Sequence, residues 1–202
     1  MSETRIIPVV LNFIRMVFLM GIIIFLIFKF IRFSDLFVEQ TKFGLEQIVL
    51  QNNKTLFIAE NGYCSENALF RTNEYAFEGS YALKLDSINR FGLSTAFEVP
   101  KSQDSVEASV WIYSSKIQKG TAHEAFIVAS IGDVFWKGSN IITDTKFGWH
   151  KLYIKFAVPA SSYTKPLTIY CWNNNNYEVY FDNLIINRSN LISFSDFILN
   201  KK

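Results

Sequence analysis

Short runs of alternating apolar and polar side chains, separated by turn residues, follow one another along most of this chain. In the run Leu167–Trp172, aliphatic residues and cysteine take every second position, and threonine, tyrosine and tryptophan take the positions between them. A period of two is that of a half-buried β-strand. The predicted strands are Leu56–Ala59, Tyr81–Leu85, Leu93–Val99, Val106–Tyr113, Ala125–Ile131, Leu152–Val158, Leu167–Trp172 and Val179–Ile186. Many short strands without alternating helices predict a mostly β chain with a β-sandwich over residues 54–190.

The asparagine run Asn173–Asn176 separates two of these strands, Leu167–Trp172 and Val179–Ile186. Asparagine tolerates the left-handed backbone conformation that tight turns require. The pattern therefore predicts a hairpin with a longer loop, in which Asp182 lies inside the returning strand.

The N-terminal region is strongly apolar. Residues 16–28 carry no polar side chain, and the apolar character extends from Ile14 to Phe33 if Lys29 and Arg32 reach towards lipid head groups. About twenty helical residues span roughly 30 Å, the hydrocarbon thickness of a bilayer. We predict one uncleaved transmembrane helix within residues 1–33. A cleaved signal peptide and a buried soluble helix are the alternatives, and no small-residue cleavage site follows the run.

The regions flanking the predicted β-sandwich are harder to assign. Basic residues are balanced across the apolar run, so the architecture alone favours a single-pass membrane protein with its β-domain on the exported side, periplasmic or extracellular. Residues 34–53 contain apolar positions at helical spacing, which indicate a juxtamembrane amphipathic helix or a linker. The tail 191–202 begins with an apolar stretch, and we expect it to pack on the sandwich or on another protein.

Composition excludes some functions. Lysine and arginine number 20 against 18 aspartate and glutamate residues, which gives a net charge of only +2 and argues against a nucleic-acid partner. Cys64 and Cys171 could form one disulfide or remain two buried thiols, and two cysteines alone cannot build a zinc site. His123 and His150 have neither metal-ligand spacing nor a nucleophile motif beside them, so we predict no catalytic site.

Aromatic residues recur on the polar side of three predicted strands, among charged and hydroxyl side chains. Aromatic rings can stack on the apolar C–H faces of sugars while polar neighbours reach the hydroxyl groups. These strands predict a sugar-binding platform, and the alternative is a face covered by the 34–53 segment, by loops or by a partner chain. The predicted ligand-binding residues are Trp111, Tyr113, Trp149, Tyr153, Tyr170 and Trp172.

The order of several motifs resembles the jelly-roll carbohydrate-binding modules of the galactose-binding-like group. The matching residues are Glu60, Glu78–Leu85 (EGSYALKL), Val106–Tyr113, Gly148–Leu152 and Val179–Asn183. The resemblance implies a jelly-roll fold over about Leu56–Asn187 and a non-catalytic, sugar-binding function. It also implies a structural calcium ion, for which Glu60 and Asp182 match the family's acids. The glycine that precedes the first acid in the family is missing here, and a solvent-facing Asp182 is the alternative to a calcium ligand.

Two functions remain open at this point. The first is a membrane-anchored, lectin-like module with a glycan as its partner. The second is a structural subunit that uses its jelly-roll domain for protein contacts within a membrane-associated envelope complex. They differ in what covers the polar and aromatic face, a glycan or a protein partner.

Overall fold

The computed structural model describes most of the chain, namely residues 15–26, 38–100, 104–118, 120, 122–159 and 163–189. The chain divides into two compact units, Met1–Val38 and Glu39–Lys202. The predicted tail 191–202 lies outside the described residues.

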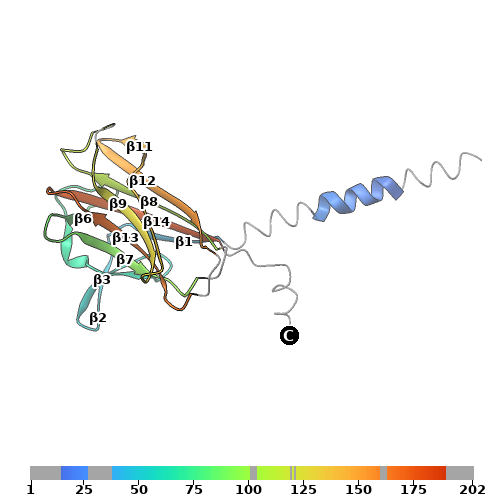
Figure 1. Cartoon of the computed structure of the whole chain (residues 1–202), viewed down its shortest axis with the longest axis horizontal. Coiled ribbons are helices and arrows are strands. Elements are labelled where there is room, and N and C mark those ends of the chain that lie inside the picture. Colours follow the sequence, from blue (N-terminus) through green and yellow to red (C-terminus); the bar gives the residue numbers. More distant parts are fainter. Residues whose placement is uncertain are drawn as a thin grey trace, which may run out of the picture. The chain divides into compact units, whose positions relative to one another are not determined.

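In the first unit, residues 15–26 form a helix (Figure 1). Its large apolar side chains are exposed, for example Phe18 at 72% and Phe25 at 63%. Among the described residues, no helix is both long enough and apolar enough to cross a membrane. Residues 14 and 27–33 of the predicted transmembrane segment lie outside the described part of the chain.

The second unit consists of antiparallel strands and a short 3-10 helix (Figure 1). The elements are β1 (Val38–Phe43), β2 (Ile48–Gln51), β3 (Lys54–Ile58), β4 (Cys64–Ser65), η2 (Ala68–Phe70), β5 (Arg71–Thr72), β6 (Ala82–Leu85), β7 (Phe91–Ala96), β8 (Ser105–Tyr113), β9 (Ala125–Ile131), β10 (Phe135–Ser139), β11 (Ile142–Lys146), β12 (Trp149–Ala157), β13 (Leu167–Asn173) and β14 (Val179–Ser189). Every predicted strand is present, with bounds that differ by a few residues.

The strands form two main sheets. The large sheet has the order β11-β12-β8-β14-β6-β5, with β1 also paired to β14, and the small sheet has the order β10-β9-β13-β7. Strands β2, β3 and β4 form a separate three-stranded sheet. From β6 to β9, and again from β12 to β14, successive strands alternate between the large and the small sheet. The mostly β, sandwich-like fold is therefore confirmed.

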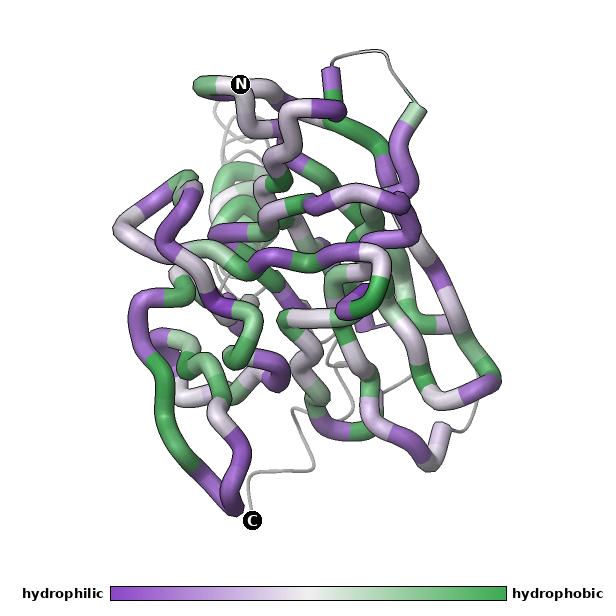
Figure 2. Tube along the Cα trace, turned by 90° about the vertical axis from the view of Figure 1, so that its left-hand side faces the viewer, coloured by the Kyte–Doolittle hydropathy of each residue, from purple (hydrophilic) through white to green (hydrophobic). Residues whose placement is uncertain are grey.

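The core lies between the two main sheets, because each strand turns one side inward. In β13, Leu167, Ile169 and Cys171 are buried, whereas the residues between them are partly exposed. They share one apolar cluster with Val110 and Ile112 of the large sheet. Figure 2 shows the same alternation as changes between hydrophobic and hydrophilic segments along the strands. Burying an aliphatic side chain of this size contributes about 1.5–3 kcal/mol, which makes this cluster the main source of stability.

The prediction of a helix or linker at residues 34–53 is wrong where the structure describes that segment. Residues 38–43 form β1, which pairs with β14, and residues 48–51 form β2, which pairs with β3. In β1, Thr41 and Phe43 are buried while Lys42 between them is only partly buried, so the period is two. The helical spacing of the apolar residues was incidental. The sandwich sheet therefore begins at Val38, upstream of the predicted boundary at residue 54.

The predicted hairpin is also wrong. Strand β13 pairs with β9 and β7 in the small sheet, whereas β14 pairs with β8 and β6 in the large sheet. The asparagine segment therefore crosses from one sheet to the other. Asn173 is fully buried, and its side-chain amide donates hydrogen bonds to the carbonyl oxygens of Leu85 (3.1 Å) and Tyr177 (2.8 Å). These bonds hold the crossover in place.

The two cysteines are not bonded to each other. Cys64 and Cys171 are both free, and Cys171 is completely buried on the inner side of β13. Burial raises the pKa of the Cys171 thiol, because the charged thiolate is disfavoured away from water. Of the two alternatives, the structure therefore has thiols, and Cys171 acts as a small apolar core residue.

Candidate binding surfaces

The six predicted ligand-binding residues do not share one surface. Two of them lie on β8, two on β12 and two on β13. Strands β8 and β12 belong to the large sheet and β13 to the small sheet, so the outward sides of these strands face away from each other across the core. Trp111, Tyr113, Trp149 and Tyr153 are thus separated from Tyr170 and Trp172. Alternation shows which side of its own sheet a residue takes, but not which sheet it joins.

Aromatic rings gather on the outer side of the small sheet. We call this surface the small-sheet platform, formed by Phe91, Phe126, Trp136, Tyr170 and Trp172. Trp172 on β13 is paired in register with Phe126 on β9 and Phe91 on β7. Its ring lies nearly parallel to both, at centroid distances of 5.1 Å from Phe126 and 6.0 Å from Phe91. Three neighbouring strands therefore supply one stacked row of rings.

Trp136 extends this platform from the edge strand β10. Its indole is 56% exposed, and its Nε1 donates a hydrogen bond to the Tyr170 hydroxyl at 3.3 Å. The indole lies against Gly138, where a Cβ would come within 2.6 Å of the ring. Glycine at this position leaves room for the ring, and the hydrogen bond sets its orientation. Phe91, at the other side of the platform, is 51% exposed.

Polar groups border the same platform at the end formed by Phe91 and Trp172. The Arg90 guanidinium donates to the Asn174 side-chain oxygen at 2.9 Å, and the Asn174 amide donates to Glu124 at 2.5 Å. Exposed flat rings beside groups that donate and accept hydrogen bonds suit a ligand with an apolar ring face and hydroxyl groups.

Three platform residues, Phe91, Phe126 and Trp136, were not predicted from the sequence. Trp136 lies on β10, a five-residue strand that was also not predicted. Burial does not alternate along this strand, because Trp136 and Lys137 are both exposed, so the sequence carried no clear strand signal here. Phe91 is the first residue of β7, and Phe126 is the second residue of β9.

The aromatic residues of the large sheet are mostly covered. Trp111 is 7% exposed and Trp149 is 5% exposed. The ring of Phe77, from the segment between β5 and β6, stacks on Trp111 at 4.1 Å with an interplanar angle of 14°, and contacts Trp149 edge-on at 5.9 Å. The alternative of a covered face therefore holds for these two tryptophans, and the cover is a loop of the same domain.

The other two predicted residues of the large sheet, Tyr153 and Tyr113, are partly exposed. Tyr153 lies beside the ion pair between Glu107 and Lys155. Burial and the Glu107 carboxylate raise the pKa of Tyr153, so its hydroxyl stays protonated. Tyr113 lines a separate hollow near the end of β8.

Asp182, one of the two predicted calcium ligands, is fully buried. Its Oδ2 accepts hydrogen bonds from the backbone N–H groups of Phe77 (2.7 Å) and Glu78 (3.1 Å), and its Oδ1 accepts one from Asn183 (2.6 Å). Burial raises the pKa of this carboxyl group to about 6, although the three hydrogen bonds act in the opposite direction. Asp182 therefore holds the Phe77 loop against the large sheet.

The two residues that the family resemblance assigns to calcium differ in their surroundings. Glu60 is exposed, and the oxygens of Asp182 already accept three N–H groups. Within the described part of the chain, no group of three or more histidine, cysteine or acidic residues is placed to hold a metal ion. Calcium prefers six to eight oxygen ligands.

Calcium binding by Glu60 and Asp182 stays a prediction, and it can be measured. An ion that binds only the folded chain raises the melting temperature by mass action. Scanning calorimetry in millimolar calcium and in chelator compares the two states. Equal melting temperatures would reject the site.

Comparison with known proteins gives distant structural similarities only. No protein-family model matches the chain, and no curated protein sequence matches it. Among solved structures, the xylan-binding family 22 module from Paenibacillus barcinonensis Xyn10C matches at a TM-score of 0.43 with 14% identity, covering 75% of this chain and 94% of that one. The family 22 module of Clostridium thermocellum Xyn10B matches at 0.40 with 17% identity, covering 61% and 81%. A family 16 carbohydrate-binding module matches at 0.39 with 19% identity, covering 62% and 86%. Similarities at such low TM-scores carry no argument about the ligand.

Proposed function

We propose that this chain is a non-catalytic carbohydrate-binding module that binds a neutral glycan on the small-sheet platform. The observation that carries the proposal is the exposure of Trp136 and Phe91 on the same face as Tyr170 and Trp172. The exposed rings of Trp136 and Phe91 offer apolar surface to a pyranose ring, and the Tyr170 hydroxyl and the Arg90–Asn174–Glu124 chain supply hydrogen bonds at its rim.

The chemistry of the platform favours binding over hydrolysis. Glycoside hydrolysis needs two carboxyl groups about 5–9.5 Å apart on either side of the bond, one of them protonated. The described residues of the platform itself are aromatic, and the carboxylate at its rim, Glu124, accepts a hydrogen bond from Asn174. An aromatic surface with one hydrogen-bonded carboxylate supports recognition without bond cleavage.

The jelly-roll assignment belongs to the same proposal. The alternation of successive strands between the large and small sheets, together with the antiparallel pairing of β8 with β12 and β14, supports this connectivity. It brings β7, β9, β10 and β13 into one sheet, and so gathers the platform residues from distant parts of the sequence.

Replacing Trp136 with alanine should weaken glycan binding about tenfold or more, because the variant loses the most exposed ring of the platform. The melting temperature should stay unchanged, since the side chain is 56% exposed. A glycan array, followed by titration calorimetry with xylohexaose as a neutral oligosaccharide probe, measures the change.

Phe147→Ala provides the matched control for this test. Phe147 is 86% exposed and lies in the turn between β11 and β12 of the large sheet, so its removal should leave affinity unchanged. A wild-type chain that retains no glycan on a broad array would overturn the proposal and leave the protein-contact function. Equal affinity in wild type and Trp136→Ala would show that the glycan binds on another surface.

We also propose that the N-terminal apolar run anchors the chain in a membrane, with the β-domain on the exported side. The proposal is supported by the exposed apolar side chains of helix 15–26, because a helix that is apolar all round needs an apolar environment. The full chain should therefore remain in the membrane pellet after alkaline carbonate extraction and be released by detergent. Release by carbonate alone would contradict the anchor.

A further inference from the structure

A hollow lies at the edge of the large sheet, where β8 ends and β14 begins. Its volume is about 490 Å³, within the range of about 300–1,000 Å³ that small-ligand sites occupy. We call it the tyrosine pocket. The residues that matter for its chemistry are Glu74, Tyr75, Tyr113, Tyr177, Glu178 and Tyr180. They come from β8, from the start of β14 and from the loops before β6 and β14.

Tyr75 forms part of the pocket wall together with two packed tyrosines. Its ring lies 4.7 Å from that of Tyr113 and 4.9 Å from that of Tyr180, centroid to centroid. Tyr180 is 5% exposed, whereas Tyr75 is 47% exposed. The buried ring therefore supports an accessible one, which is the arrangement of a stacking surface held in a fixed position.

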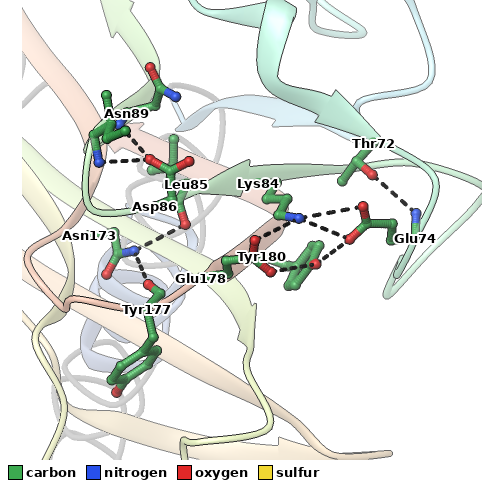
Figure 3. A network of polar contacts seen from close by, with 11 residues as sticks. Thr72, Glu74, Lys84, Leu85, Asp86, Asn89, Asn173, Tyr177, Glu178 and Tyr180 are labelled. Atoms are coloured by element: carbon green, nitrogen blue, oxygen red, sulfur yellow. Dashed lines mark hydrogen bonds and ion pairs between the residues drawn. The ribbon is translucent and has the colours of Figure 1, made fainter.

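The two carboxylates of the pocket are held in place by Lys84 (Figure 3). Its Nζ lies 3.2 Å from Glu74 and 2.9 Å from Glu178, and the Tyr180 hydroxyl donates a hydrogen bond to Glu74. The hydrogen bond from Tyr180 is the main cause that lowers the pKa of Glu74, so this carboxylate is ionised at neutral pH. An ionised Glu74 cannot act as the general acid of a hydrolase.

Both carboxylates keep capacity to accept further hydrogen bonds. The Glu74 and Glu178 side chains are 51% and 55% exposed. An ionised carboxylate has about four acceptor sites, and the contacts with Lys84 and Tyr180 use only part of them. The free sites suit the hydroxyl groups of a ligand, which are donors.

Two of the chain's own ammonium groups already lie over tyrosine rings of the pocket. Lys84 Nζ lies 5.6 Å from the centre of the Tyr180 ring, and Lys116 Nζ lies 5.2 Å from that of Tyr177. Two lysines thus balance the two glutamates. A cation would meet these ammonium groups, and an anion would meet the carboxylates, so a neutral ligand is favoured.

We propose that the tyrosine pocket is a second saccharide site, which takes a neutral sugar ring stacked on Tyr75 with its hydroxyl groups bound by Glu74 and Glu178. The class of ligand in this inference rests on the proposed function, but the tyrosine pocket is a separate site on the other main sheet. The platform receives a glycan on an open face, and the tyrosine pocket receives it in a hollow.

Titration calorimetry of the full chain with xylohexaose tests this site. The wild type should bind two molecules, and Tyr75→Ala should lose at least about tenfold in affinity at one site while the other is unchanged. Glu178→Gln should weaken the same site. Tyr75→Phe, which keeps the ring, should still bind two molecules. Trp136→Ala should bind only one molecule, in the tyrosine pocket. Melting curves of all variants check that the fold is intact.

The outcomes separate the two sites. If the wild type binds one molecule and Trp136→Ala binds none, the proposed site in the tyrosine pocket is overturned and the platform site is supported. If binding is lost in Tyr75→Ala but is unaffected in Trp136→Ala, the site in the tyrosine pocket is supported and the platform site is overturned. Tyr75-dependent binding of tetramethylammonium without any binding of xylohexaose overturns the saccharide assignment. Binding to neither site overturns both proposals.

Discussion

Replacing Trp111 with alanine should lower the free energy of unfolding by about 3–5 kcal/mol, the range for removing a large aromatic side chain from a packed cluster. Trp111 is 7% exposed, and Phe77 stacks on it at 4.1 Å. The variant leaves a cavity under Phe77 and removes the surface on which the loop between β5 and β6 rests. Urea unfolding followed by circular dichroism measures the loss.

Trp136→Ala is the matched control for Trp111→Ala. The same chemical change is made on an indole that is 56% exposed, so the free energy of unfolding should change by no more than about 0.5 kcal/mol. The two variants should therefore show opposite profiles, one losing stability and the other losing glycan affinity. Equal stability of the two variants would contradict the covering role of Phe77.

Asp182→Ala should destabilise the fold by about 2–4 kcal/mol, because it leaves the N–H groups of Phe77, Glu78 and Asn183 without their acceptor. The Phe77 loop would lose its attachment to β14. Asp182→Asn keeps one acceptor oxygen and should lose less. Hydrogen exchange at the three amide groups is the direct measurement, and unchanged protection in Asp182→Ala would contradict this role.

The same carboxyl group should make stability depend on pH. Its pKa is about 6 in the folded chain, above about 3.9 in an unfolded chain. Between these values the folded state binds more protons, so Asp182 contributes most to stability below about pH 4, and this contribution is lost as the pH rises through 6. The difference amounts to about 3 kcal/mol. Asp182→Asn should remove it, and an equal pH dependence in wild type and variant would reject the shift.

Strand positions and their inward sides could be predicted from the sequence, because alternation is a local property. Leu167, Ile169 and Cys171 are buried and Tyr170 and Trp172 point outward, as their parity predicts. The same reasoning missed β10 and with it Trp136, since a short edge strand with few apolar residues gives a weak signal. It also predicted a helix or linker where β1 lies, because the partner of β1, strand β14, is far along the chain.

The sequence by itself determined the β-sandwich class, the core face of each predicted strand and the presence of outward aromatic residues. Only the tertiary structure decided which of those residues are accessible. Trp111 and Trp136 both point away from the core, yet Trp111 is covered because Asp182 holds the Phe77 loop over it, across 105 residues of sequence. Sheet membership likewise depends on long-range pairing. Alternation is set by the backbone of one strand, whereas exposure is set by whatever distant segment packs on it.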